Sequence, residues 1–413
     1  MTPQPHGWTV TRLKHIAYLN AGGTPDVGNS SYWAPPTEGV PWVTIGDMSS
    51  QPVVQATSRA LTTGGLRAAR LRPSPPGTIL FSMYASLGHT ARLGRDGVWN
   101  QAILGIIPTS RVDSRFLEYC LLSLRKELPS LARSNTQQNL NAEQVGNLEL
   151  PLPPLDEQRR IADFLDAETK RSARIVAAHV RLHEALVSRR WSLFQRLLRN
   201  VEASPTPLRR VLEFITDGPF GSAFSSSNYS ETGAAVVRLG NIGFGEYRSH
   251  EQAFIPLDLY RRLIRHKVIS GDLLIAGLGD ARNHAGRACV APDLGPAIVK
   301  GKCFCARVSK RVADPKFLSL LLSSPIGEQA MDSRGSTRAM INLEVVKSAI
   351  VPLPDLNDQV NIAMAMYKAD ELQRKVARAV SRQEGLLAER RHSLITAAVT
   401  GQIDVTTTRG SEV

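Results

Sequence analysis

Two loops that follow apolar, strand-like runs gather side chains suited to hydrogen bonding with a polar or anionic partner. They are SMYASLGHTARLGR at residues 82–95 and AGLGDARNHAGR at residues 276–287. Arginine and asparagine can each form two hydrogen bonds with a guanine or adenine edge in the major groove of DNA, although ordinary solvated loops have a similar composition. The candidate DNA-contacting residues in these loops are Tyr84, His89, Arg92, Arg95, Arg282, Asn283, His284 and Arg287.

Two further polar segments, NTQQNLN at residues 135–141 and STRAMIN at residues 336–342, each follow an arginine. Hydroxyl, amide and guanidinium groups of this kind bind phosphates or base edges, and a solvated loop is again the alternative. Another arginine stands in VVRLGNI at residues 236–242. The candidate DNA-contacting residues from these segments are Arg133, Gln137, Gln138, Arg238, Arg334, Thr337 and Arg338.

The sequence carries no catalytic signature. In GPAIVKGK at residues 295–302 the glycine spacing is one residue too long for a phosphate-binding loop, and Cys303 stands where a magnesium-binding Ser or Thr is required. HExxH, GxSxG and the Asn/Asp-Pro-Pro-Tyr/Phe tetrapeptide of amino-methylating DNA methyltransferases are all missing. We therefore expect a non-catalytic protein without a metal or cofactor, and a degenerate restriction or methylation enzyme is the alternative.

The composition favours a basic globular protein. The 413 residues include 50 Lys and Arg against 37 Asp and Glu, a formal net charge of +13, which suits nucleic-acid binding but also occurs on solvated surfaces. No secretory signal and no run of ~20 apolar residues is present, so we expect a cytoplasmic protein that does not contact a membrane. The four cysteines form no CxxC pair, which favours buried thiols over zinc.

The elements that must position these loops occur twice. The block LPLPPLDEQRRIADFLDAE at residues 150–168 resembles VPLPDLNDQVNIAMAMYKAD at residues 351–370, with Pro153 and Pro354 lying 201 residues apart. The same offset holds without a gap over about 80 residues, which indicates that one structural unit was built twice. Earlier in each half, WVTIGDM (42–48) resembles VVRLGNI (236–242), and PGTILFS (76–82) resembles SGDLLIA (270–276).

A proline-free stretch rich in helix-forming residues follows each proline block. Asp156 and Asn357 are the expected N-caps, and a helix of ~44 residues at 1.5 Å per residue is about 65 Å long. Each stretch carries an apolar stripe at heptad-like spacing, so we expect the two helices to pair as an antiparallel coiled coil. The residues of the stripes are Ile161, Leu165, Ile175, Leu186, Leu193, Ile362, Met366, Val376, Leu387 and Leu394.

The rest of the chain has the pattern of mixed α/β domains. Strands are expected at residues 40–45, 78–83, 235–239 and 272–276, and short helices at residues 115–128 and 315–323. The predicted fold class is α+β or α/β, with two domains related by pseudo-two-fold symmetry and joined by the two helices. The expected boundaries are 1–150 for the first domain, 151–203 for the first helix, 204–350 for the second domain, 351–405 for the second helix and 406–413 for a disordered tail.

With these motifs the sequence closely resembles the specificity subunits of type I restriction-modification systems. The resemblance rests on the doubled PLPPLDEQRRIADFL and PLPDLNDQVNIAMAM, on GWTVTRLKHIA and DGPFGSAF…VVRLGNI at the starts of the two halves, and on TAAVTGQIDV near the end. It covers nearly the whole chain. The second block departs from the first in having Asn357 and Asp358 in place of Asp156 and Glu157, and Gly385 interrupts its helix, so the two helices are expected to dock partners unequally.

The resemblance implies two target recognition domains that each read one half of a split DNA sequence, and a helical spacer whose stripe residues also dock partners. The implied partners are double-stranded DNA, two methyltransferase subunits and motor-nuclease subunits. S-adenosylmethionine, ATP and magnesium are expected only on those partner subunits. A DNA-binding scaffold without sequence specificity is the alternative function.

Overall fold

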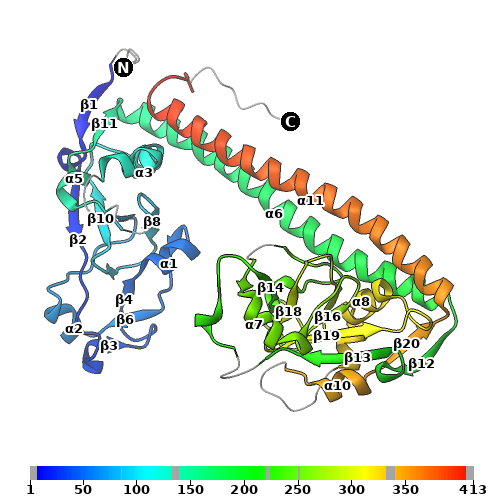
Figure 1. The fold of residues 1–413 in the computed structure, drawn as a ribbon. Helices are drawn as coiled ribbons and strands as arrows, with labels where there is room; N and C mark the ends of the chain where they lie inside the picture. The colour runs from blue at the N-terminus through cyan, green and yellow to red at the C-terminus, as the bar shows by residue number, and fades with distance from the viewer. Residues whose placement is uncertain are drawn as a thin grey trace. The chain divides into compact units, whose positions relative to one another are not determined.

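The computed structural model of the protein describes residues 7–84, 86–132, 139–219, 224–249, 252–331 and 340–405. Contacts divide the chain into two compact units, Met1–His179 with Val380–Val413, and Val180–Ala379. Each unit holds one α/β domain and a section of each of two long helices, α6 and α11, which both run from one unit into the other (Figure 1). The expected tail at residues 406–413 lies outside the described residues.

The first domain is built on a five-stranded sheet of order β2-β10-β7-β8-β5 and a four-stranded sheet of order β3-β6-β4-β9. The central strand β7 buries Ile79, Leu80 and Phe81 in succession, because both of its faces are covered. The strands are β1 (Thr9–Arg12), β2 (Ala17–Ala21), β3 (Trp33–Ala34), β4 (Val40–Val43), β5 (Val53–Val54), β6 (Arg59–Leu61), β7 (Ile79–Ser82), β8 (Thr90–Leu93), β9 (Val98–Trp99), β10 (Ile103–Pro108) and β11 (Glu149–Leu152). The helices are α1 (Ile45–Ser50), α2 (Thr63–Ala68), α3 (Ser114–Ser123), α4 (Leu128–Leu131) and α5 (Ala142–Gly146).

The second domain contains a four-stranded sheet of order β13-β19-β16-β17 and a three-stranded sheet of order β15-β14-β18. Its strands are β12 (Ala203–Pro207), β13 (Leu212–Asp217), β14 (Ala234–Val237), β15 (Phe254–Ile255), β16 (Leu273–Ala276), β17 (Ala288–Val290), β18 (Ala297–Val299), β19 (Cys303–Val308) and β20 (Ile350–Pro354). The helices are α7 (Leu257–Arg262), α8 (Pro315–Ser323), α9 (Pro325–Ala330) and α10 (Leu343–Ser348). All four cysteines are free and buried, as the sequence predicts.

The two domains share one strand plan, which confirms the repeat. The order β2-β10-β7-β8 corresponds to β13-β19-β16-β17, the pair β1-β11 corresponds to β12-β20, and the parallel pair β4-β9 corresponds to the parallel pair β14-β18. The four predicted strands are present as β4, β7, β14 and β16, and the predicted helix at residues 315–323 is α8. The predicted helix at residues 115–128 is wrong in extent: α3 ends at Ser123, a 3-10 turn follows at Leu124–Lys126, and α4 begins at Leu128 with Pro129 in its first turn, where a missing N–H is tolerated.

The two long helices are confirmed as α6 (Leu155–Arg199) and α11 (Leu356–Val399). The expected interruption at Gly385 is wrong, because α11 continues through that residue. The predicted N-cap at Asn357 is wrong, because the helix already begins at Leu356 and the Asp355 carboxylate accepts the N–H of Asp358 at 2.9 Å. The predicted N-cap at Asp156 is wrong for the same reason, since α6 begins one residue before it.

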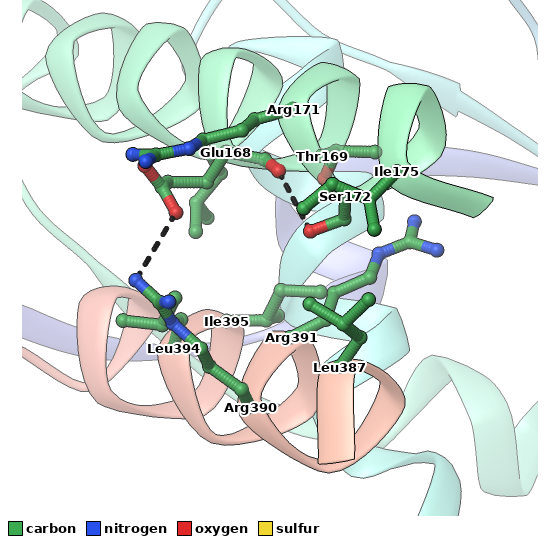
Figure 2. A pocket seen from close by; sticks show the side chains of 11 residues that line it. Glu168, Thr169, Arg171, Ser172, Ile175, Leu387, Arg390, Arg391, Leu394 and Ile395 are labelled. Carbon is green, nitrogen blue, oxygen red and sulfur yellow. Dashed lines mark hydrogen bonds and ion pairs between the residues drawn. The ribbon is translucent and has the colours of Figure 1, made fainter. Parts of the chain in front are cut away.

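Within each unit α6 and α11 run antiparallel (Figure 1). In the first unit Glu168 lies 3.7 Å from Arg390 and His179 lies 3.3 Å from Glu384, so numbers rise on one helix as they fall on the other. Figure 2 shows the side chains of Ile175 and Leu387 pointing into the space between these two helices. In the second unit the Gln373 amide donates to the Leu186 carbonyl at 3.0 Å, and Arg190 pairs with Asp370 nearer the helix ends.

The apolar stripes pack against the domain cores at their ends and lie on the helix pair between them. At one end Ile161 and Leu165 are buried in the core of the first domain together with Ile395 of α11. At the other end Ile362 and Met366 are buried in the core of the second domain. Leu193 is half-buried and packs against that second core. The remaining stripe residues are half-buried on the helix pair; they are Ile175, Leu186, Val376, Leu387 and Leu394.

Candidate nucleic-acid interface and its helical supports

A buried glutamine joins each domain to its long helix. The Gln158 side chain accepts the N–H of Asp113 at 2.8 Å and donates to the carbonyls of Pro153 at 2.8 Å and Arg111 at 3.3 Å. Asp113 also caps α3, so one side chain ties the start of α6 to the start of α3. Gln158 is 1% exposed, and its amide therefore has its hydrogen bonds met by the protein rather than by water.

The second copy repeats this junction atom for atom. The Gln359 side chain accepts the N–H of Asp314 at 2.9 Å and donates to the carbonyls of Pro354 at 2.9 Å and Val312 at 3.1 Å. Each partner lies 201 residues after its counterpart in the first domain. The glutamine of the repeated block therefore fixes the angle at which each helix leaves its domain.

Charged contacts hold the domains to the helices differently in the two units. In the first unit Arg115 of α3 lies 2.7 Å from Asp163 and 2.9 Å from Asp166, and the Tyr119 hydroxyl donates to Asp166 at 2.7 Å. Burial raises the pKa of Tyr119 to about 12, so it remains a donor at neutral pH. Arg390 supplies the ion pair with Glu168 drawn in Figure 2.

In the second unit the Arg190 guanidinium forms two hydrogen bonds to Asp370, at 2.7 and 2.8 Å. It also donates to the Phe244 carbonyl at 3.0 Å and lies over the Trp191 ring, with 4.3 Å between the guanidinium carbon and the ring centroid. The Tyr367 hydroxyl donates to the neighbouring Gly245 carbonyl at 3.3 Å. One loop of the second domain, through the carbonyls of Phe244 and Gly245, thus contacts both helices.

The strand plan brings two basic turns of the second domain together. Strands β14 and β18 are parallel and pair Val237 with Val299, so the residues that follow them leave the same edge of the sheet side by side (Figure 1). Arg238 follows β14, Lys300 follows β18, and the Lys300 N–H donates to the Val237 carbonyl at 3.0 Å. The carboxyl ends of parallel strands are the usual place for ligand contacts in open α/β sheets.

These turns line a cavity of about 350 Å³, here called the edge pocket, formed by residues 238–241 and 300–302. Its lining includes Arg238, Lys300 and Lys302 and contains no carboxylate. The Lys300 ammonium donates to the Tyr229 hydroxyl at 2.8 Å and lies 4.7 Å from the Phe224 ring centroid, which holds this cation in one place. Such a pocket suits a group rich in hydrogen-bond acceptors.

The corresponding edge of the first domain has different chemistry. Strands β4 and β9 pair Val43 with Trp99 in parallel, and the Asn100 N–H donates to the Val43 carbonyl at 3.1 Å. The residue after β4 is Thr44, whose hydroxyl donates to the Asp47 carboxylate at 2.7 Å in a capping box at the start of α1. Hydroxyl, carboxylate and amide groups therefore stand where the second domain has cations.

The predicted loop in the first domain is only partly available for contact. Tyr84 is 38% exposed and Arg95 is also exposed. The His89 ring lies 3.2 Å from the Met48 carbonyl, and Arg92 belongs to strand β8, where it pairs with Glu118 at 2.9 Å. Burial raises the pKa of Glu118. Tyr84 and Arg95 thus remain the better-placed candidates of this loop.

The predicted loop in the second domain contains mainly structural side chains. Arg287 is 4% exposed and donates to four carbonyls, those of Leu239, Ile242, Leu278 and His284. Burial lowers its pKa, and these carbonyls keep its charge hydrogen-bonded. Arg287 therefore holds the base of the loop to the 238–242 turn.

The neighbouring residues of this loop are arranged in the same way. The His284 ring packs on Phe244 and lies 3.2 Å from the Ser323 carbonyl. The Asn283 amide donates to the Asp280 carboxylate at 3.0 Å, and the pKa of Asp280 is lowered by its hydrogen bonds from Arg282 and Asn283. Arg282 itself is exposed, which makes it the best-placed candidate here.

Six candidates lie outside the described residues: Arg133, Gln137, Gln138, Arg334, Thr337 and Arg338. Sequence reasoning missed other basic residues. Lys300 and Lys302 were considered only as part of a possible phosphate-binding loop. Arg70, which has a positive φ of 53°, and Arg72 line a second cavity of about 250 Å³ with Asn20 in the first domain. Basic residues directly after a predicted strand were the signal that could have found Lys300 and Lys302.

The described part of the chain holds neither a metal site nor a membrane span. Among those residues, no group of three or more His, Cys, Asp or Glu side chains is placed to hold a metal ion. Every described helix is also too short or too polar to cross a bilayer.

Comparison with known proteins identifies the family. The family described as type I restriction modification DNA specificity domain matches residues 5–176 and 270–379, more than half of the chain. The specificity subunit of the type I restriction enzyme MjaIX from Methanocaldococcus jannaschii is 28% identical over 165 residues, covering 39% of this chain and 38% of the relative. The EcoBI specificity subunit of Escherichia coli is 23% identical over 356 residues, covering 75% of this chain and 71% of the relative.

A solved structure from a study of complex assembly and conformational transition in a type I restriction-modification system has the same fold. It matches with a TM-score of 0.63 at 18% identity, covering 98% of this chain and 100% of that chain. The doubled domains, the coiled coil that joins them and the family match agree with one another. The chain therefore belongs to the type I restriction-modification DNA specificity family and is a specificity subunit.

Proposed function

We propose that each of the two domains reads one half of a split DNA target. The observation that supports this most strongly is the contrast between the two sheet edges. One strand plan is built twice, yet Arg238 and Lys300 stand in the second copy where Thr44 and Asn100 stand in the first. Cations and neutral amide or hydroxyl groups select different base edges and phosphates. Two copies of one frame with different contact residues are suited to two different sequences.

The helices supply the gap between the two half-sites in this proposal. They are 45 and 44 residues long, roughly 65 Å of α-helix at 1.5 Å per residue. That length is close to two turns of B-DNA at about 34 Å each. Base pairs between the half-sites would then remain unread, and the glutamine junctions would keep the two reading angles constant.

In the proposed assembly the chain itself is a non-catalytic subunit. It positions two methyltransferase subunits, which bind S-adenosylmethionine and methylate adenine, and motor-nuclease subunits, which use ATP and magnesium to translocate and cut DNA. The helix pair is the proposed docking surface, and its stripe residues Ile175, Leu186, Val376 and Leu387 are half-buried along it. The complex works on DNA in the cytoplasm, and the chain needs no cofactor.

The DNA motif that becomes methylated tests this function. It is measured in the genome of cells that express the chain with its methyltransferase and motor-nuclease subunits. We expect single-molecule sequencing to return one motif made of two specified half-sites with a fixed unspecified gap. Methylation of one continuous motif would contradict the two-reader model. Salt-sensitive binding that is equal for all DNA sequences would favour a non-specific scaffold. Methyl transfer or cleavage by the purified chain alone would favour an enzyme.

A further inference from the structure

We propose that the edge pocket of the second domain is a DNA-contacting site that binds an acceptor-rich group, either a guanine edge or a backbone phosphate. The inference rests on the proposed function and adds the residues and chemistry of one contact. The sequence pattern points to Arg238 in this pocket but not to Lys300 or Lys302. The pocket brings all three together from two turns that are distant in sequence.

The floor of the pocket is rigid before any ligand arrives. The Asn241 side chain accepts the N–H of Arg238 at 2.9 Å and donates to the Arg248 carbonyl at 2.9 Å, which fixes the first turn. Gly218 fixes the second turn: its N–H donates to the Gly301 carbonyl at 3.2 Å, and a Cβ there would lie 2.3 Å from the Gly301 nitrogen. Donors that are already held in place lose little conformational entropy when a ligand binds, so they raise the affinity for that ligand.

Lys300 has capacity for a ligand. Its ammonium has three donors, and the Tyr229 hydroxyl accepts one of them. Gly240 also lines the pocket, and a Cβ there would meet no described atom within 4 Å, so the lining has room at this position. Phosphate oxygens and the O6 and N7 atoms of guanine fit this arrangement.

The first domain provides an internal comparison on the same frame. At the matching edge Thr44 is held by Asp47, and Asn100 accepts the N–H of Ala102 at 3.1 Å through its side chain. This edge is neutral to acidic where the edge pocket is cationic. The cationic character is therefore specific to the second copy, as expected for a residue set that determines one half of the target.

The test measures DNA affinity of the complex of this chain with its methyltransferase subunits. The probe is duplex DNA that carries the motif found to be methylated in cells. The affinity of the complex for this probe is measured at several salt concentrations. We expect Lys302→Ala and Arg238→Gln each to lower affinity roughly tenfold. The matched control is Lys310→Ala, which removes an exposed lysine just after the opposite end of β19, and this variant should bind as the unchanged chain does.

A steric variant keeps the test independent of charge and folding. Gly240→Leu adds a large side chain to the pocket lining while every cation stays in place, so it should weaken binding without lowering the thermal stability of the complex. Contact with a guanine edge predicts that Arg238→Gln relaxes the modified motif at one position of one half-site. Contact with phosphate predicts an unchanged motif and a salt dependence of log affinity that falls by about 0.9 per cation removed.

The pocket proposal is overturned if Lys302→Ala, Arg238→Gln and Gly240→Leu all bind and modify DNA as Lys310→Ala does. In that case a split motif from the unchanged chain would leave the two-reader function standing. If the unchanged chain gives no split motif, the proposed function fails, and the pocket proposal, which rests on it, fails with it.

Discussion

Replacing Gln359 with leucine tests whether the repeated glutamine is the joint between a domain and its helix. The substitution keeps a similar volume but removes the acceptor of the Asp314 N–H and the donor to the carbonyls of Pro354 and Val312. Gln359 is 0% exposed, so water cannot replace these partners. A buried N–H left without an acceptor costs ~1–3 kcal/mol, and each lost hydrogen bond adds about 1 kcal/mol. We expect a loss of about 3 kcal/mol from the stability of the second unit.

Denaturant unfolding combined with amide hydrogen exchange measures this loss. Exchange should accelerate at the Asp314 amide and through the first turns of α8 and α11, while the first domain stays protected. The matched control is Gln373→Leu on the same helix, whose amide makes one hydrogen bond to the Leu186 carbonyl at a half-buried position. It should cost under ~1 kcal/mol. Equal effects of the two substitutions, or faster exchange in the first domain instead, would refute the claim that Gln359 joins the second domain to α11.

Three further predictions concern buried polar groups. Asp370→Asn should destabilise the second unit by about 3 kcal/mol in denaturant unfolding, because the side chains of Arg190 and Asp370 are only 12% and 14% exposed; Glu371→Gln, next to it but exposed, should change little, and equal effects would contradict this. Arg287→Met should lower stability by roughly 2–4 kcal/mol, since four carbonyls lose their donor; a stable variant with weaker DNA binding would instead make Arg287 a contact residue. Burial raises the pKa of Cys289 from 9.0 to about 12, so the folded state holds its proton while the unfolded state releases it above pH 9.0; stability should fall between pH 9 and 12, and Cys289→Ser should reduce that fall.

The repeat was predictable from the sequence because equal spacing survives even where residues change. Apolar runs such as the one at residues 78–83 identified central strands, and the proline-free stretches identified both long helices. The exact helix starts were not predictable, since Asp355 and Asn357 are both good capping residues and the fold selects Asp355. Helix boundaries depend on such local competition.

The candidate site was less predictable than the fold. Arg287 and Arg282 look alike in sequence, yet one is buried under four carbonyls and the other is exposed, because only the folded chain shows which turn closes over which. The edge pocket was missed for a related reason. Arg238 and Lys300 lie far apart in the chain, and the parallel pairing of β14 with β18 alone brings them together. Pairing between strands that are distant in the chain cannot be predicted from a single sequence.

The stripes on the long helices were predicted as a pairing surface, and their ends have a second role. Ile161 and Leu165 complete the core of the first domain, and Ile362 and Met366 complete that of the second. Each domain core therefore includes part of the helix pair, so a change at these positions would affect domain stability as well as helix pairing. Residues such as Ile175 and Leu387, which lie between the two helices and outside both domain cores, are better positions for testing helix pairing alone.

The exchange of one reading domain tests the central claim most directly. Residues 1–150 are replaced with the matching segment of a relative that modifies a different split target, and the modified motif is read from cells that also express the methyltransferase subunits. One half-site should change to that of the relative, while the other half-site and the gap stay the same. A motif in which both half-sites change, or neither does, would contradict two independent readers on one helical spacer.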